Sequence, residues 1–240
     1  RNGIIAGSPV TEEDYYRIRE EIPGLKLHIS YGQTETSPCV SISDVEDSDQ
    51  DCACSAGKVI RHCEVRILDS GGRQLSAGED GEICVRGYQV MQGYYKLPQE
   101  TGKVIDADGW LHTGDLALMD AEGNITIKGR SKNLLLSASG QNIYPEEIED
   151  KLNNLPYVSE SIIVQQNEKL VGLVYPDFDE AFAHGLKNED IERVMEENRV
   201  ALNAMLPAYS QILKMKIYPE EFEKTPKKSI KRYLYQEAKG

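Results

Sequence analysis

The sequence predicts a mixed fold, α+β with α/β character, that is divided into two regions between residues 129 and 130. Short alternating segments separated by glycine-rich turns fill most of residues 58–129 and indicate a β-rich part. After Gly129 the pattern changes to helical and strand segments in alternation, which is typical of a small α+β domain. We therefore expect one domain over residues 1–129, a boundary at residues 130–132, and a second domain over residues 130–240.

The first 35 residues predict a helix and a strand that lead into a polar loop. Thr11 and Asp14 have the form of a capping box, and apolar residues follow at helical spacing, so a helix is expected from about residue 12 to residue 22. Residues 25–30, LKLHIS, alternate in the manner of a strand. The next five residues, YGQTE, therefore follow a strand, which is a usual position for ligand contacts in α/β proteins.

The following stretch predicts an exposed loop and then a β-rich subdomain. Residues 43–52 are acidic and carry few apolar side chains, which is typical of a solvated loop. EVRIL (64–68) and EICVR (82–86) predict strands joined by hairpins, and two more strands are expected around the turn at residues 121–124. We expect these strands to form a small, barrel-like subdomain.

The second region predicts two helices that flank a β-hairpin. Pro145 suits the first turn of a helix, and Glu146 and Glu147 suit its positive end. Two apolar runs joined through Asn167 predict a hairpin. A second helix is expected to begin at Asn188 and to end before Pro207.

The composition excludes several classes of protein. The 240 residues carry a net charge of −13. This argues against a general nucleic-acid-binding surface, because binding a polyanion requires clustered Lys and Arg. No stretch approaches the roughly 20 apolar residues that cross a bilayer. The chain begins with Arg rather than Met, so we expect it to be a piece of a longer protein.

The five cysteines lack the paired spacing of a zinc finger or of a disulfide scaffold, and a reduced cytoplasmic setting is expected. Cys52 and Cys54 offer two metal ligands at most, and we interpret them as free thiols in an acidic loop.

Five polar motifs occur in a fixed order, and each one alone is compatible with an ordinary turn or core position. In order they are YGQTE (31–35), GEI with MQGYY (81–95), WLHTGDL (110–116), GRSK (129–132) and GQNIYPEEIE (140–149). Together with AGSPV (6–10), they resemble the motifs of the adenylate-forming superfamily. Within it they are most similar to the acyl-CoA synthetase branch, and there to the long-chain fatty acid ligases. The resemblance covers nearly the whole chain and implies that residues 1–129 are the C-terminal part of an AMP-binding domain.

The resemblance implies a nucleotide site around YGQTE, and the chemistry of these residues suits it. The ring of Tyr31 offers a flat face for adenine, although a buried core tyrosine is the alternative. Gly32 lets a backbone approach a ligand, and the Thr34 hydroxyl can donate to a phosphate during catalysis. Glu35 is a hard oxygen ligand for the Mg²⁺ that bridges phosphates.

Further residues are assigned to the same site by the resemblance. Gly7 and Ser8, in AGSPV, are expected to contact the nucleotide. Asp115 would hold the ribose hydroxyls, as an acidic residue does in dinucleotide folds, and Arg130 would contact ribose or phosphate. A turn residue and a surface ion pair are the respective alternatives. His112 is expected to have a structural or orienting role, because a carboxylate nucleophile needs no general base.

The resemblance also implies a mobile second domain. Lys132 stands where the family has its hinge, which must absorb backbone changes without touching substrate. Gly140 would allow the pantetheine arm of coenzyme A to pass. A solvated lysine and a plain turn glycine are the alternatives.

The sequence departs from the motif pattern of the family in two features. The glycine-rich phosphate loop that precedes YGxTE in the family is absent, so these residues alone are expected to be inactive. The family's TxxGK motif is replaced by TPKKSIKR (225–232), in which direct alignment places Ser229 at the lysine. Lys228 is the expected catalytic lysine, with Lys227 as the alternative, and a basic surface tail is the remaining interpretation.

The sequence therefore predicts the C-terminal portion of an ATP-dependent, AMP-forming acid–CoA ligase that activates a fatty acid. Its expected ligands are ATP and AMP, Mg²⁺, coenzyme A and a small carboxylic acid, in the cytoplasm or at a membrane surface through the acyl substrate. An acyl-AMP ligase that loads a carrier-protein thiol and a non-catalytic nucleotide-binding module are the alternatives.

Overall fold

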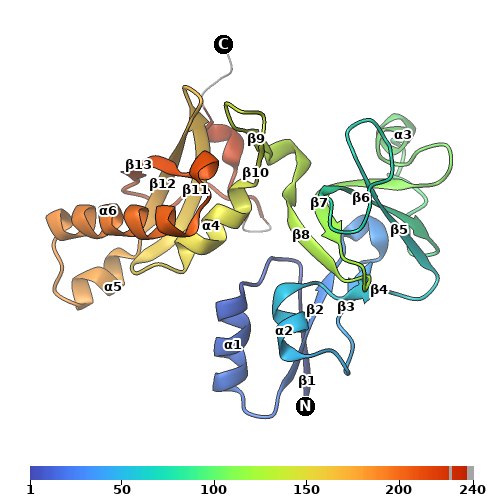
Figure 1. The fold of residues 1–240 in the computed structure, drawn as a ribbon, viewed down its shortest axis with the longest axis horizontal. Helices are drawn as coiled ribbons and strands as arrows, with labels where there is room; N and C mark the ends of the chain where they lie inside the picture. The colour runs from blue at the N-terminus through green and yellow to red at the C-terminus, as the bar shows by residue number, and fades with distance from the viewer. Residues whose placement is uncertain (227–228, 237–240) are drawn as a thin grey trace. The chain divides into compact units, whose positions relative to one another are not determined.

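The computed structural model describes residues 1–226 and 229–236, and its chain divides into two compact units, Arg1–Lys132 and Asn133–Gly240 (Figure 1). Each unit has its own sheets and its own hydrophobic core. Within the described residues, no helix is both long and apolar enough to cross a membrane. The expected domain boundary at residues 130–132 stays a prediction.

The first unit begins with a βαβ element. Helix α1 (Glu12–Glu21) connects two parallel strands, and the Thr11 hydroxyl accepts a hydrogen bond from the Asp14 amide at 3.1 Å, which confirms the predicted cap. Tyr15 on this helix is fully buried and packs with Leu27. In pairing order, the strands of this sheet are β1 (Asn2–Ala6), β2 (Lys26–Tyr31), β3 (Ser41–Ile42) and β4 (Lys58–Val59).

The prediction of an exposed acidic loop was wrong over its last residues. Helix α2 (Asp49–Cys54) begins there because Ser48 caps it: the Ser48 hydroxyl accepts from the Asp51 amide at 3.1 Å, and the Asp51 carboxylate accepts from the Ser48 amide. Cys52 is fully buried in the core beside α1. The buried face of α2 consists of Cys52 and Ala53, which is too short to predict a helix among the charged residues around it.

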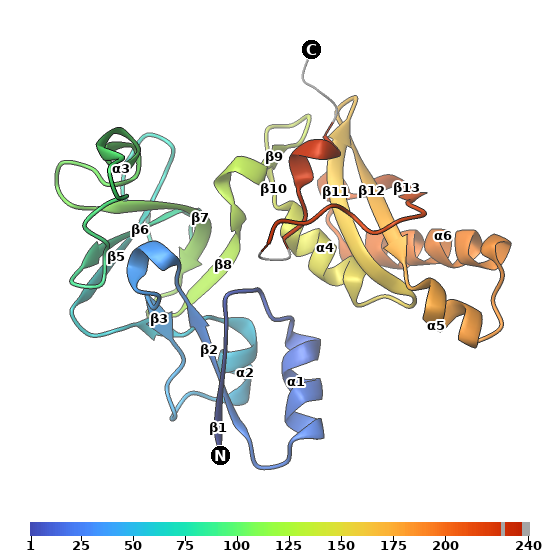
Figure 2. The ribbon, with the colours of Figure 1, turned by 180° about the vertical axis from the view of Figure 1, so that it is seen from behind.

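The second sheet of this unit is an antiparallel meander rather than a barrel. A barrel requires its edge strands to pair, but among the described residues β5 and β8 remain the two edges. The predicted hairpins are present. Helix α3 (Pro98–Val104) belongs to the connection that leads from the second strand to the third, and Figure 2 shows it at one side of the sheet. The strands are β5 (Cys63–Leu68), β6 (Gly81–Gly87), β7 (Leu111–Met119) and β8 (Ile125–Arg130).

One core cluster joins the two sheets of the first unit. It combines Tyr31 of β2 and Val40, which directly precedes β3, with Ile83, Ala117 and Ile125 from the second sheet. Backbone bonds add to this junction, since the Ala56 amide donates to Ile125 at 2.7 Å. Residues that are distant in the sequence, such as Tyr31 and strand β7, are thereby held within reach of one another.

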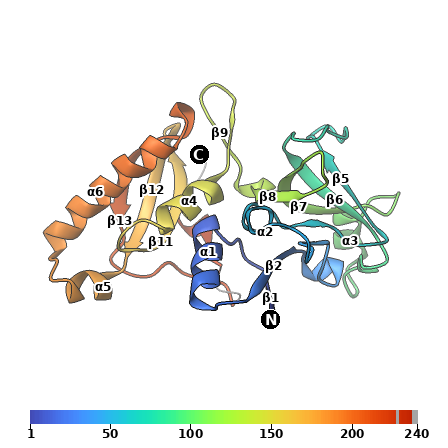
Figure 3. The ribbon, with the colours of Figure 1, turned by 60° about the horizontal axis from the view of Figure 1, so that its bottom comes forward.

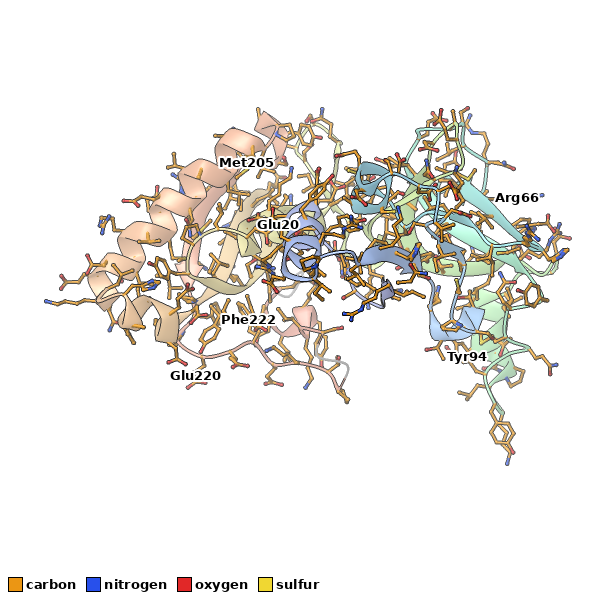
Figure 4. All side chains as sticks on the ribbon, turned by 90° about the horizontal axis from the view of Figure 1, so that it is seen from below. Glu20, Arg66, Tyr94, Met205, Glu220 and Phe222 are labelled. Atoms are coloured by element: carbon orange, nitrogen blue, oxygen red, sulfur yellow. The ribbon has the colours of Figure 1, made fainter. Side chains whose placement is uncertain are left out.

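The second unit has a three-stranded sheet with both faces covered (Figure 3). Residues alternate along the strands: Ile163 and Val174 pack under the helices, whereas Ile162 and Leu173 pack against Phe222 of the C-terminal segment. Figure 4 shows Met205 of helix α6 and Phe222 on opposite sides of this sheet. The elements are β9 (Leu135–Leu136), β10 (Asn142–Ile143), α4 (Pro145–Asn153), β11 (Val158–Gln166), β12 (Lys169–Pro176), α5 (Phe178–Ala183), α6 (Asn188–Met205) and β13 (Ile212–Ile217).

The expected elements of the second region are confirmed. Helices α4 and α6 begin at the predicted Pro145 and Asn188. Strands β11 and β12 pair antiparallel through Asn167 and Glu168, whose φ angles of 49° and 61° are those of a two-residue hairpin turn. Asparagine tolerates this left-handed conformation, which explains why the turn was visible in the sequence.

A buried ion pair fastens the C-terminal segment to the second unit. Glu149 on α4 is 6% exposed, and its Oε1 accepts from the Ile163 amide at 2.6 Å and from Arg232 Nη1 at 2.7 Å. Arg232 Nη2 bonds the other carboxylate oxygen, so the pair is bidentate. Burial raises the pKa of Glu149 to about 7, against the opposing effects of Arg232 and the Ile163 amide.

We expect Glu149→Ala and Arg232→Ala each to lower the free energy of unfolding by about 3 to 5 kcal/mol, because each leaves a buried charge without its partner. Urea denaturation followed by circular dichroism measures the change. Arg193→Ala is the control, because Arg193 pairs with Glu197 on the exposed face of α6 and its loss should leave the midpoint almost unchanged. Equal effects of the buried and exposed substitutions would contradict the anchoring role.

Candidate functional site

Two loops of the candidate site leave the first sheet at the same edge. Strands β1 and β2 are parallel, and Ala6 is in register with Ser30. The carboxyl ends of parallel strands meet at one edge, so Gly7 and Ser8 follow β1 where Tyr31 ends β2. Gly7 has a φ of 86° and Ser8 is exposed, so both belong to a turn at the surface. The structure therefore brings AGSPV and YGQTE together, as a shared ligand site requires.

Three predicted residues form one hydrogen-bonded cluster. The hydroxyl of Tyr31 donates to Asp115 Oδ2 at 2.7 Å, and Arg130 Nε lies 2.8 Å from Asp115 Oδ1. Asp115 on β7 and Arg130 on β8 are directly paired in the antiparallel register. We refer to Tyr31, Asp115 and Arg130 as the carboxylate cluster. Since its members come from three strands, their meeting depends on the packing of the two sheets.

The electrostatics of the carboxylate cluster keep the Tyr31 hydroxyl protonated. Asp115 is 5% exposed, and the charge of Arg130 beside it offsets the cost of burying a carboxylate. Burial, and then the negative charge of Asp115, raise the pKa of Tyr31 far above its ordinary value, so Tyr31 remains a neutral donor. The Arg130 side chain is 47% exposed, so its guanidinium stays accessible to a ligand.

Thr113 supports the carboxylate cluster, and the sequence did not reveal it. Its hydroxyl donates to the Ile83 carbonyl at 2.7 Å and accepts from the Asp115 amide at 3.1 Å. Its carbonyl accepts from Arg130 Nη1 at 3.4 Å and from Gln33 Nε2 at 3.5 Å. The sequence pointed to Thr113 through its position in the WLHTGDL motif alone, between His112 and Asp115, which had predicted roles.

Gly32 has a packing reason for lacking a side chain. A Cβ there would lie 1.6 Å from the carbonyl oxygen of Pro38. The following turn, η1 (Thr34–Thr36), is closed by the Thr36 hydroxyl, which accepts from the Gln33 amide at 3.0 Å. Thr34 is exposed at the start of this turn. The loop is thus tightly built, and Thr34 is available to solvent.

Glu35 is oriented by a residue of the MQGYY motif that had no predicted role. The hydroxyl of Tyr94 donates to Glu35 Oε1 at 2.8 Å, and the Met91 amide donates to the Glu35 carbonyl at 2.8 Å. Donating this hydrogen bond to Glu35 raises the pKa of Tyr94, and burial is the second cause. Figure 4 shows Tyr94 beside the η1 turn. Two motifs that are more than fifty residues apart therefore form one structure around this carboxylate.

His112 belongs to a different set of contacts. Its Nδ1 lies 2.9 Å from Glu82 Oε2, and the other oxygen of Glu82 accepts from the Gly114 amide at 3.0 Å. This arrangement holds the chain directly before Asp115. The orienting role expected of His112 stays a prediction.

The remaining predicted residues lie elsewhere. Lys132 is exposed in η2 (Ser131–Asn133), at the end of the first unit. Gly140 has a φ of 79° in the turn between β9 and β10, and its amide donates to the Ser137 carbonyl at 2.9 Å, so this glycine has a structural role in the second unit. Lys227 and Lys228 lie outside the described residues.

Comparisons with known proteins agree with the geometry. Residues 1–95 match the family model of the AMP-binding enzymes, and residues 132–238 match that of the AMP-binding enzyme C-terminal domain. The chain is 36% identical over 238 residues to YngI of Bacillus subtilis (strain 168), whose name assigns it to the acyl-CoA synthetases, and this covers 99% of the chain and 42% of YngI. It is 39% identical over 173 residues to the mitochondrial medium-chain acyl-CoA ligase ACSF2 of Macaca fascicularis, covering 72% of the chain and 28% of that ligase.

The fold comparison gives the same family. The o-succinylbenzoate CoA synthetase of Bacillus subtilis, solved with the acyl-adenylate intermediate OSB-AMP, superimposes with a TM-score of 0.80 at 25% identity, covering 99% of this chain and 46% of that one. The chain belongs to the AMP-binding, adenylate-forming enzymes. Within them, its relatives place it in the acyl-CoA synthetase branch. It spans less than half the length of these relatives.

We expect Gly32→Ala to destabilise the first unit by about 2 to 3 kcal/mol, because the added methyl group must displace the Pro38 carbonyl. Thermal unfolding measures the loss. Gly102→Ala in α3 is the control: nothing lies within 4 Å of its Cβ position, so alanine should be neutral or slightly stabilising there. Equal melting temperatures for the two variants would contradict the tight packing of the loop.

Proposed function

We propose that this chain supplies part of the adenylate site and the second domain of an ATP-dependent, AMP-forming acid–CoA ligase. The observation that carries the proposal is the carboxylate cluster, in which Tyr31, Asp115 and Arg130 meet beside the strand ends. In the first half-reaction, the substrate carboxylate attacks the α-phosphorus of ATP and pyrophosphate leaves, giving acyl-AMP. In the second, the thiolate of coenzyme A attacks the acyl carbon and AMP leaves.

The cluster suits recognition of AMP for a physical reason. A carboxylate accepts hydrogen bonds from paired hydroxyls, so Asp115 can hold the ribose. Tyr31 and Arg130 fix the direction of that carboxylate before a ligand arrives, which lowers the ordering cost of binding. The accessible guanidinium of Arg130 can also bind phosphate or ribose oxygen. The ring of Tyr31 remains the proposed face for adenine.

The residues around Glu35 fit a magnesium ion that accompanies ATP. Mg²⁺ takes one or two carboxylates together with phosphate oxygens and water, and Glu35 is a half-buried carboxylate whose orientation Tyr94 fixes. When bound, the ion would neutralise charge on the phosphates. Exposed Thr34 is proposed to donate to a phosphate oxygen, and Gly7 and Ser8 to contact the nucleotide from the neighbouring loop.

The second half-reaction is assigned to the other named residues. We propose that Lys132 is the hinge about which the second domain turns, and that the turn at Gly140 passes the pantetheine arm of coenzyme A. Lys228, or Lys227 in its place, is proposed to meet the acyl carboxylate and the α-phosphate. These 240 residues lack the family's glycine-rich phosphate loop, so turnover is proposed to need residues beyond them.

The acid is proposed to be a fatty acid of medium length. The sequence favoured a long-chain acid, but ACSF2 is named as a medium-chain ligase. The cytoplasmic location stays a prediction, because that relative is named as mitochondrial.

We expect Asp115→Ala to weaken AMP binding by the 240-residue chain about 10- to 100-fold, because hydrogen bonds to a charged group contribute about 1.5 to 3 kcal/mol. Asp115→Asn, which keeps the shape and removes the charge, should weaken binding in the same direction. Titration calorimetry with AMP measures the affinity, and circular dichroism checks the fold. Glu122→Ala, in the exposed β7–β8 turn, removes the same charge and should bind AMP normally. Equal affinities for the Asp115 and Glu122 variants would refute the ribose role.

The reaction is tested by exchange of pyrophosphate into ATP, in the presence of fatty acids, by the protein extended to the length of its relatives. Exchange that depends on the acid, followed by release of AMP that free coenzyme A accelerates, is the expected result. Acceleration by a carrier protein but not by coenzyme A would favour the carrier-loading alternative. AMP binding without any exchange would favour the non-catalytic module and overturn the enzyme.

A further inference from the structure

A compact group of potential metal ligands lies on the second sheet of the first unit, apart from the carboxylate cluster. Glu82 and Cys84 come from β6 and His112 from β7, and their ligand atoms all lie within 4.8 Å of one another. We refer to these three residues as the Glu-Cys-His group. Nothing in the proposed reaction uses the thiol or the imidazole, so their convergence is not explained by the nucleotide site.

Strand geometry explains why the three side chains meet. Glu82 and Cys84 are two residues apart on β6 and therefore project from the same face. Cys84 is directly opposite His112 in the antiparallel register, so their side chains are cross-strand neighbours. The register with β7 shifts here, because Glu82 is opposite Leu116 and Cys84 is opposite His112, so the extra residues of the bulge lie in β7. One residue of displacement in either strand would separate the group.

The distances are those of zinc ligands around one centre. The Cys84 sulfur lies 3.4 Å from His112 Nδ1, and Glu82 Oε2 lies 2.9 Å from the same nitrogen. With metal bonds of about 2.3 Å to sulfur and about 2.0 Å to nitrogen, the sulfur–nitrogen distance corresponds to a sulfur–metal–nitrogen angle of roughly 100°, near the tetrahedral value. With a metal–oxygen bond of about 2.0 Å, the oxygen–nitrogen distance corresponds to an oxygen–metal–nitrogen angle of roughly 90°.

The surroundings of the group resemble the outer shell of a metal site. Asp106 Oδ2 lies 3.7 Å from Nε2 of His112, on the side of the ring away from the group. A carboxylate near the second nitrogen is a usual neighbour of a metal-bound histidine, although 3.7 Å is longer than a hydrogen bond. The other oxygen of Glu82 is held by the Gly114 amide at 3.0 Å, so this carboxylate is oriented too. His112 and Glu82 are about one-third exposed, at 35% and 28%, which leaves a path from solvent.

We propose that Glu82, Cys84 and His112 bind a zinc ion, with water in the fourth position. A cysteine sulfur, an imidazole nitrogen and one carboxylate oxygen form a mixed donor set that suits Zn²⁺. Mg²⁺ instead prefers oxygen ligands alone. Formation of the zinc–sulfur bond releases the thiol proton to water, and no oxidation or reduction occurs.

A metal–thiolate bond distinguishes this proposal from a simple hydrogen-bonded group. The Cys84 sulfur lies 3.4 Å from His112 Nδ1 in either case. A bound ion requires the thiolate form of Cys84, which gives the site a spectroscopic signature that hydrogen bonding alone cannot produce.

The test uses the 240-residue chain freed of metals with a chelator. Cobalt(II) replaces zinc as an absorbing probe, and one equivalent should produce a sulfur-to-cobalt charge-transfer band that one equivalent of Zn²⁺ abolishes. Because the ion binds the folded state, Zn²⁺ should also raise the melting temperature. Cys84→Ser should remove the band, and His112→Gln should weaken Co²⁺ affinity at least tenfold.

Cys54→Ser is the matched control, because Cys54 is exposed and lies outside the group, so its loss should leave the band unchanged. Circular dichroism of each variant without metal shows whether it folds, and His112→Gln, at a partly exposed position, provides the test if Cys84→Ser does not fold. No stoichiometric cobalt binding, a band that survives Cys84→Ser, or a band that disappears with Cys54→Ser would each overturn the site.

Discussion

A buried carboxylate must be compensated by partners, and this constraint organises both units of the chain. Asp115 is 5% exposed and is satisfied by a phenol from β2 and a guanidinium from β8. Glu149 is 6% exposed and is satisfied by an amide of β11 and a guanidinium near the C-terminus. An uncompensated charge in either place would cost several kcal/mol, so each carboxylate holds together segments that are far apart in the sequence.

The two pairs have different consequences because their arginines differ in exposure. The side chain of Arg232 is 18% exposed and pairs with Glu149, which holds the C-terminal segment to the second unit. That of Arg130 is 47% exposed, so it can bind a ligand and still orient Asp115. Binding without reorganisation requires a polar group that its neighbours hold in place and that a ligand can still reach. This difference separates the proposed ligand contact from the structural anchor.

Local signals in the sequence predicted the elements, and the ordered motifs predicted the members of the carboxylate cluster. The cap at Thr11, the proline at 145 and the turn at Asn167 act over a few residues and were read correctly. The helix at Asp49–Cys54 was missed because charge masks a two-residue apolar face. The partners Tyr94 for Glu35 and Arg232 for Glu149 were missed because strand register and packing create such contacts, and no local spacing encodes them.

Long-range contacts of the same kind hold the residues on either side of Lys227 and Lys228. On one side of Lys227 and Lys228, Lys224 pairs with Glu160 at 2.6 Å, and on the other side Arg232 pairs with Glu149. The Thr225 amide also donates to the Ser229 carbonyl at 2.8 Å, so both flanks are joined to each other and to the sheet of the second unit. The described residues on both flanks are therefore held by carboxylates of α4 and β11, so they belong to the body of the second unit.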